Sequence, residues 1–189
     1  LNEETTKKLT SNVTVHEFKW SPDGKQIAAA VAEKNLIDYS YMFKRIHLID
    51  PVNGALTKIV ENPGKLTEIS WSPDGKHLAF VAGVDINDPV SGSLFVTEIP
   101  AVKPFSELRN YSAGFLGSVE KICWKDENTI LFSAEEGVDI TLSRQGINDK
   151  ERKLLIEPGR VVFSSFSYNN GVVSLPGNTP QHPSELFIY

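Results

Sequence analysis

Short apolar runs of strand length, separated by polar segments rich in turn-forming residues, recur along the whole chain. At its start, the runs cover residues 13–20, 26–31 and 45–50, and a shorter run covers residues 56–60. Runs of this length bounded by Gly, Pro, Asn and Asp are typical of β-strands. Hardly any segment has the period of an amphipathic helix. The pattern therefore predicts an all-β chain.

The same plan returns three more times. The predicted strands are residues 66–71, 77–81, 93–99 and 105–108 in the second unit, 119–124, 129–133, 138–144 and 152–156 in the third, and 160–166, 171–175 and 185–189 in the fourth. The units cover about residues 13–60, 66–109, 117–156 and 160–189 of one domain. Four antiparallel strands in about fifty residues are typical of a β-propeller blade, so we expect about four blades' worth of propeller.

One hexapeptide marks the repeat. Trp-Ser-Pro-Asp-Gly-Lys occurs at residues 20–25 and again at residues 71–76, and weaker copies follow in the third and fourth units. Because the aromatic residue ends the first strand of each unit, we expect its ring to pack between adjacent blades, where it buries about 150–250 Å². This column of aromatic residues consists of Trp20, Trp71, Trp124 and Phe166, at intervals of 51, 53 and 42 residues.

The hexapeptide also predicts a tight hairpin. Proline presets φ near −65° at the first central position of a turn, aspartate accepts hydrogen bonds from the turn backbone, and glycine adopts a positive φ. We expect these roles for Pro22, Asp23 and Gly24, and again for Pro73, Asp74 and Gly75. Turn stabilisation explains both aspartates without any ligand.

The phase of the repeat bears on the two ends of the chain. In propellers of this pattern, the short strand before each inner strand is the outermost strand of the previous blade. Residues 5–9 would then belong to a missing blade, or would return to complete the fourth blade in a ring of four. We favour a segment of a larger propeller, because four blades lie at the small end of the known range. Since the chain begins at Leu1 without a methionine, we also expect its start to be a cut.

Composition and charge exclude several classes of partner. The 189 residues are 40% hydrophobic and 23% charged, with a net charge of −5 and scattered basic residues, which argues against nucleic acid and against an anionic membrane surface. No apolar stretch reaches the ~18 residues of a membrane span. Cys123 is the only cysteine, so an internal disulfide is excluded and a cytoplasmic location is favoured. The four histidines lie far from one another and from Cys123, so we expect no metal and no cofactor.

Two segments outside the repeat are candidate contact sites. The connection at residues 33–44 holds Tyr39, Tyr41 and Phe43, and exposed aromatic residues on a loop often mark binding. Packing against a neighbouring blade, or against a catalytic domain outside the chain, is the favoured interpretation. Residues 85–88 carry oxygen atoms that suit calcium, but they lack the Gly and the closing Glu of a helix-loop-helix calcium site, so a solvated loop is favoured.

The repeat resembles that of two groups of proteins. Trp-Ser-Pro-Asp-Gly-Lys followed by Gln-Ile-Ala or His-Leu-Ala-Phe is similar to the propeller repeat of the prolyl oligopeptidase family of serine peptidases and to that of the Tol-Pal translocation propeller. The resemblance covers nearly the whole chain. Residues 180–189 also resemble a Pro-x-Glu-Leu-Tyr stretch in the last blade of the peptidases. This stretch and the irregular spacing of the units favour acylaminoacyl-peptidase-like or dipeptidyl-peptidase-like members.

The resemblance implies a parent enzyme in which an α/β-hydrolase domain carries Ser, Asp and His while the propeller limits access to short oligopeptides. The Gly-x-Ser-x-Gly elbow of such a domain is absent from these 189 residues, so we predict no catalytic residue and an inactive chain. Some dipeptidyl peptidases hold the substrate amino terminus with paired glutamates on a helical insertion. The adjacent pair Glu135 and Glu136 lies in a strand connection, so that role is not assigned to it.

Two functions therefore remain open. The first is the non-catalytic propeller portion of a serine peptidase, which gates and orients oligopeptide substrates for a hydrolase domain that this chain lacks. The second is a Tol-Pal-like or stand-alone propeller that binds a protein partner. A homo-oligomer formed through unpaired edge strands is compatible with both.

Overall fold

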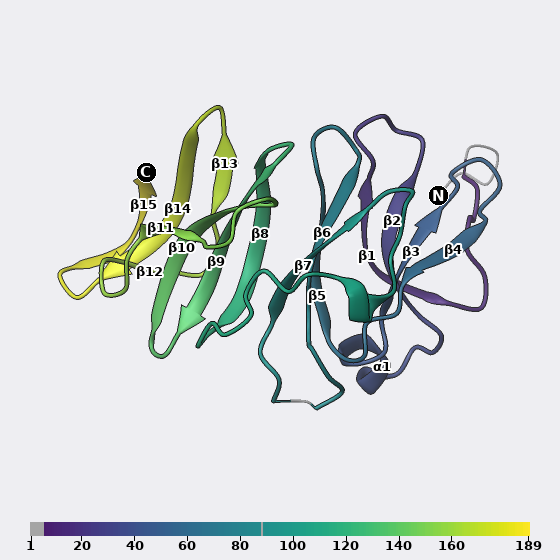
Figure 1. The fold of residues 1–189 in the computed structure, drawn as a ribbon, viewed down its shortest axis with the longest axis horizontal. Coiled ribbons are helices and arrows are strands. Elements are labelled where there is room, and N and C mark those ends of the chain that lie inside the picture. The colour runs from purple at the N-terminus through teal and green to yellow at the C-terminus, as the bar shows by residue number, and fades with distance from the viewer. Residues whose placement is uncertain (1–5, 88) are drawn as a thin grey trace.

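Four antiparallel β-sheets stand in a row in the computed structural model, which describes residues 6–87 and 89–189 (Figure 1). The first sheet contains β1 (Thr14–Trp20), β2 (Ile27–Ala32), β3 (Arg45–Ile49) and β4 (Leu56–Val60), and the second contains β5 (Leu66–Trp71), β6 (His77–Ala82) and β7 (Ser93–Glu98). The third contains β8 (Ser118–Asp126), β9 (Thr129–Glu136), β10 (Asp139–Gly146) and β11 (Lys153–Ile156), and the fourth contains β12 (Val162–Phe163), β13 (Ser167–Asn169), β14 (Val172–Thr179) and β15 (His182–Ile188). The predicted architecture of antiparallel β-propeller blades is confirmed.

The two identical hexapeptides form two identical turns. Asp23 accepts hydrogen bonds from the Ser21 hydroxyl at 2.7 Å and from the Lys25 backbone N–H at 3.1 Å, and Gly24 has φ of 70°. Asp74 accepts the equivalent two bonds at 2.7 and 3.1 Å, and Gly75 has φ of 71°. In each turn the aspartate oxygen thus accepts the backbone N–H of the lysine, which would otherwise have no partner in the turn. Any residue other than glycine would be strained at the positive φ of Gly24 and Gly75.

The aromatic column joins the first three sheets. Trp71 is 9% exposed, and its Nε1–H donates to the backbone oxygen of Lys19, the residue before Trp20, at 3.1 Å. Trp124 is 6% exposed and donates in the same way to the backbone oxygen of Ser70, at 3.0 Å. Each indole therefore fills the space between two sheets and also satisfies its only polar atom.

Trp20 does not have the predicted role. It is 51% exposed, because β1 is the inner strand of the sheet at one end of the row and no described sheet precedes it (Figure 1). The prediction for Phe166 is also wrong, because this residue lies half-buried between β12 and β13 and not at the end of a strand. The predicted single strand over residues 160–166 is wrong.

A proline explains the break in the fourth inner strand. Val173 exchanges two backbone hydrogen bonds with Tyr189, at 2.9 and 2.8 Å. Alternate residues of an antiparallel strand face opposite neighbours, so Ser174 and Pro176 direct their backbone groups toward the inner strand. Ser174 pairs with β13, but Pro176 has no N–H to donate. Pairing accordingly stops between β13 and β12, with a one-residue shift in register.

The second sheet has three strands. The prediction of an outer strand at residues 105–108 is therefore wrong. Phe105–Glu107 form a 3₁₀ turn that follows Pro104. The ring of Phe105 packs on Phe95, with centroids 4.7 Å apart, and on Phe80, at 6.5 Å. The proline removes a ladder donor, and the ring is buried on the face of the sheet. The outer edge of β7 pairs instead through an isolated bridge between Phe95 and Asn110. The outer runs of the first and third units do pair, as β4 and β11.

Residues 6–9 form no strand, which corrects the expectation for residues 5–9, of which Thr5 lies outside the described residues. Lys7 donates to the backbone oxygen of Val52, and Leu9 packs on the cluster that contains Ile27 and Ala29 of the first sheet. The fourth sheet lies at the opposite end of the row (Figure 1). These residues therefore cover the first sheet and do not complete the fourth.

Replacing Trp71 by Ala will lower the free energy of unfolding by about 3–5 kcal/mol, because the change leaves a cavity between two sheets. Trp20→Ala is the matched control, since the same hexapeptide surrounds an exposed ring, and it will cost less than about 1 kcal/mol. Urea melts of both variants and of the unchanged chain measure the difference. Equal losses for the two variants would contradict the burial of Trp71 as the reason.

Candidate binding cleft between the third and fourth sheets

The inner strands of the sheets lie side by side, and their edges carry a row of charges. Each of the first three inner strands has a register shift at the same place, between the fifth and the third residue before its tryptophan. Such a bulge re-aims the side chains beside it. The residues after the shifts are Glu17, Glu68 and Lys121. Sequence reasoning missed this row, although comparison of the repeats at the third position before each tryptophan would have revealed it.

One ion pair crosses between two of these strands. Lys121 of β8 donates to Glu68 of β5 at 2.8 Å, and this hydrogen bond raises the pKa of Lys121. Glu17 instead forms an ion pair within its own strand, with Lys19 at 3.6 Å. Burial raises its pKa, and the like charge of Glu68 adds to the effect. The positive charge of Lys121 is thus held toward the second sheet.

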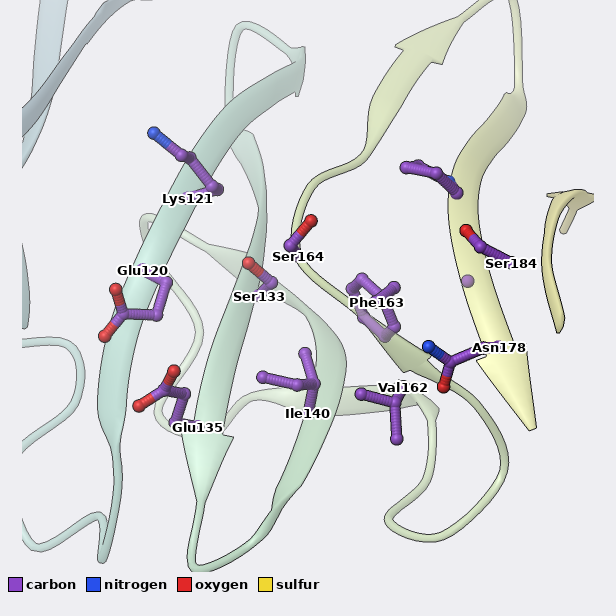
Figure 2. Close-up of a pocket in the computed structure, with 12 residues that line it drawn as sticks. Glu120, Lys121, Ser133, Glu135, Ile140, Val162, Phe163, Ser164, Asn178 and Ser184 are labelled. Carbon is purple, nitrogen blue, oxygen red and sulfur yellow. The ribbon is translucent and has the colours of Figure 1, made fainter. Parts of the chain in front are cut away.

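Beyond Lys121, a cleft of about 370 Å³ opens between the third and fourth sheets (Figure 2). Its volume lies within the range of small-ligand sites. One side is formed by β8, β9 and β10 and the other by the fourth sheet, whose inner strand is interrupted at this level. The lining residues are Glu120, Lys121, Ser133, Glu135, Ile140, Val162, Phe163, Ser164, Pro176, Gly177, Asn178 and Ser184.

Glu135 and Glu136 are the last two residues of β9, so their predicted place in a strand connection is wrong. Consecutive strand residues face opposite sides of the sheet. Glu135 lines the cleft. Glu136 instead accepts two hydrogen bonds from the guanidinium of Arg152, at 2.8 and 2.9 Å, and one from the Thr141 hydroxyl at 2.6 Å. The bond from Arg152 is the main cause of the lowered pKa of Glu136. The two glutamates therefore do not act as a pair.

The predicted contact segment, residues 33–44, contains a short helix, α1 (Ile37–Tyr41), which the sequence analysis did not predict. Tyr39 and Phe43 pack on each other with ring centroids 5.0 Å apart, whereas Tyr41 is 62% exposed. The three aromatic residues are thus split between local packing and an exposed surface. None of them lines the cleft.

The other candidates carry no site. Asp85 accepts the backbone N–H of Asn87 at 2.7 Å, as in a solvated turn, while Asp88 lies outside the described residues. Burial raises the pKa of the Cys123 thiol, which disfavours the reactive thiolate. Within residues 6–87 and 89–189, no cluster of three or more His, Cys, Asp or Glu side chains could hold a metal ion. No helix in those residues is long and apolar enough to cross a membrane.

No protein-family model matches the chain, and no curated protein matches it. Solved structures do. A puromycin-hydrolysing peptidase from Mycobacterium tuberculosis is 16% identical, with a TM-score of 0.73, and the match covers 94% of this chain and 30% of that one. The β-propeller domain of the trilobed protease from Pyrococcus furiosus is 18% identical, with a TM-score of 0.65 and coverages of 91% and 48%.

TolB from Acinetobacter baumannii is similar as well. It is 18% identical, with a TM-score of 0.61, and the match covers 93% of this chain and 40% of TolB. The chain therefore spans between 30% and 48% of the length of these three structures. At such identities the likeness shows the fold, which is that of a β-propeller. It places propellers of peptidases and of TolB among the structural neighbours.

Replacing Glu136 by Gln will lower the free energy of unfolding at pH 7 by about 1–2 kcal/mol, because the charged bidentate pair with Arg152 is lost. The lowered pKa of Glu136 means that its contribution is present above the unfolded-state value and disappears as the pH falls through the folded-state value. The difference between the variant and the unchanged chain will therefore shrink in melts below that pH. Glu135→Gln is the control and will leave the stability within about 0.5 kcal/mol.

Proposed function

We propose that these four blades are the non-catalytic propeller portion of a serine peptidase and that they gate and orient oligopeptides for an α/β-hydrolase domain outside this chain. The observation that carries the proposal is the fold likeness to peptidase propellers over more than nine tenths of the chain. The Gly-x-Ser-x-Gly elbow is absent from the sequence, which agrees with a portion that gates and does not cleave.

The structure offers a physical basis for such a gate. The indoles of Trp71 and Trp124 fix the spacing of three inner strands, so that the edge they share is rigid. One wall of the cleft, formed by β8, β9 and β10, lies on this frame, so a group bound there is ordered without loss of much protein entropy. Short peptides fit a cleft of this size and folded proteins do not. A scaffold of this kind restricts and aligns substrates.

The test is to treat the full-length protein and the 189-residue chain with a fluorophosphonate probe, which labels activated serines, and then with short acylated and free-amine peptides. We expect labelling and cleavage by the full-length protein alone. Labelling will be lost after replacement of the serine in its Gly-x-Ser-x-Gly elbow. A full-length protein that takes no label and cleaves no peptide would overturn the proposal.

A protein-binding module is the second candidate, and two observations favour it. One is the likeness to TolB. The other is the apolar surface of α1 and the residue before it, where Leu36, Ile37 and Tyr41 are largely exposed. A propeller that acts only by docking would present such a surface to a partner. The fluorophosphonate experiment separates the two functions, since a docking module has no activated serine.

A further inference from the structure

The outer edge of the fourth sheet is open in the described part of the chain. In the first and third sheets a fourth strand, β4 or β11, pairs along the outside of the third strand. In the fourth sheet β15 is the outermost strand, and among the described strands it pairs only with β14. It lies at the end of the row, beside the C-terminus (Figure 1). Its outer edge therefore offers unpaired backbone groups to another strand.

The hydrogen bonds to β14 determine which backbone groups are open. Tyr189 exchanges two backbone hydrogen bonds with Val173, at 2.9 and 2.8 Å, so the odd-numbered residues at this end of β15 direct their backbone toward β14. Ser184, Leu186 and Ile188 accordingly direct their N–H and C=O groups to the open edge. None of the three is a proline, so each can donate to a further strand.

The side chains along this edge are apolar and exposed. Leu186 and Ile188 are each 74% exposed, and Tyr189 is 57% exposed. Edge strands are commonly protected from pairing by lysine, by proline or by a bulge. Residues 184–189 contain neither lysine nor proline, and their pairing with β14 is regular. The edge thus has the features of a strand that pairs with a further strand.

A groove of about 470 Å³ lies beside the same edge. Its apolar lining includes Leu155 and Phe187, which also belong to the apolar cluster between the third and fourth sheets. Its charged residues are Glu157 and Arg160. Arg160 and Glu185 of β15 are both exposed, and neither forms an ion pair with another described residue. A strand that pairs with β15 and brings a carboxylate into the groove would therefore meet a free guanidinium group.

A second copy of β15 brings that carboxylate. When two antiparallel strands pair about a twofold axis, directly opposite residues face the same side of the joined sheet. An axis at Leu186 places Glu185 opposite Phe187 of the second copy, and an axis at Phe187 places it opposite Tyr189. Phe187 and Tyr189 both line the groove. In either register, Glu185 of one copy enters the groove that holds Arg160 of the other.

We propose that the open edge of β15 is a dimer interface, in which a second copy of this chain extends the fourth sheet and Glu185 of each copy pairs with Arg160 of the other. On the opposite face of the joined sheet, Leu186 meets Leu186 or Ile188 of the second copy. One strand pair buries less area than a standard interface, so we expect a weak dimer with a dissociation constant of about 10–100 μM.

Sedimentation velocity of the 189-residue chain at about 1–500 μM spans the expected dissociation constant and tests the proposal. The sedimentation coefficient will rise with concentration toward that of a dimer. Leu186→Lys will weaken association about tenfold or more, because it places a charge in the apolar centre of the strand pair. Leu116→Lys is the matched control and will leave association unchanged, since Leu116 is 92% exposed and lies outside β15. A chain that stays monomeric throughout would overturn the proposal.

An exchange of charges locates the interface. Arg160→Glu and Glu185→Arg will each weaken self-association several-fold, because like charges then meet in the groove. An equal mixture of the two variants will associate as the unchanged chain does, because each mixed dimer again joins opposite charges in both grooves. Glu157→Gln will tighten association, since Glu157 has the same sign as the entering Glu185. Thermal melts establish that each variant is folded. A mixture that associates no better than either variant alone would contradict the pairing.

The full-length protein is measured over the same concentrations. Dimers that dissociate with Leu186→Lys are expected there as well. A monomeric full-length protein would show that another part of the polypeptide covers β15 and would overturn the proposal. The interface goes beyond the proposed gating function and is tested separately, because fluorophosphonate labelling reports an activated serine whether or not the protein forms dimers.

Discussion

The hydrogen bond from each buried indole to the preceding sheet is the interaction on which the rest of the structure depends. Trp71 donates to the backbone oxygen of Lys19, and Trp124 donates to that of Ser70. The acceptor is in both cases the residue before the previous tryptophan, so one repeated contact sets the offset of successive inner strands. A large ring fills the gap between the sheets, and its one polar atom fixes the height at which the next sheet docks. The charged row at the inner edge is aligned by this offset.

Local features of the fold could be predicted from the sequence, because their causes lie within a few residues. The turns that contain Asp23 and Asp74 are determined by the hexapeptide itself, and the strands beside them follow from the apolar runs. The strand expected at residues 105–108 failed for a distant reason, since the ring of Phe105 finds Phe80 and Phe95 on the face of the sheet. Apolar periodicity does not distinguish burial on a face from pairing at an edge.

The cleft could not be predicted, because it depends on contacts between units. Its walls come from β8 to β10 and from the fourth sheet, and its charge depends on Glu68 of the second sheet, which lies outside it. Nothing near Lys121 in the sequence shows that its ammonium group is held by a residue 53 positions earlier. The sequence shows only that Glu68 and Lys121 occupy the same position of the repeat. That position indicates a contact once the bulges are known to recur there.

The departure of the fourth unit from the repeat accounts for the place of the cleft. Phenylalanine stands where the earlier units have tryptophan, and its ring has no N–H to donate, so the junction of the third and fourth sheets lacks the hydrogen bond that joins the others. Pro176 removes a second donor, which breaks the inner strand beside Ser164. Each loss is worth about 1 kcal/mol, so apolar packing of Leu131 against Phe163 and Leu175 joins the third and fourth sheets instead. The aromatic position is thus a tryptophan in the first three units and departs from that pattern in the fourth, which forms one side of the cleft.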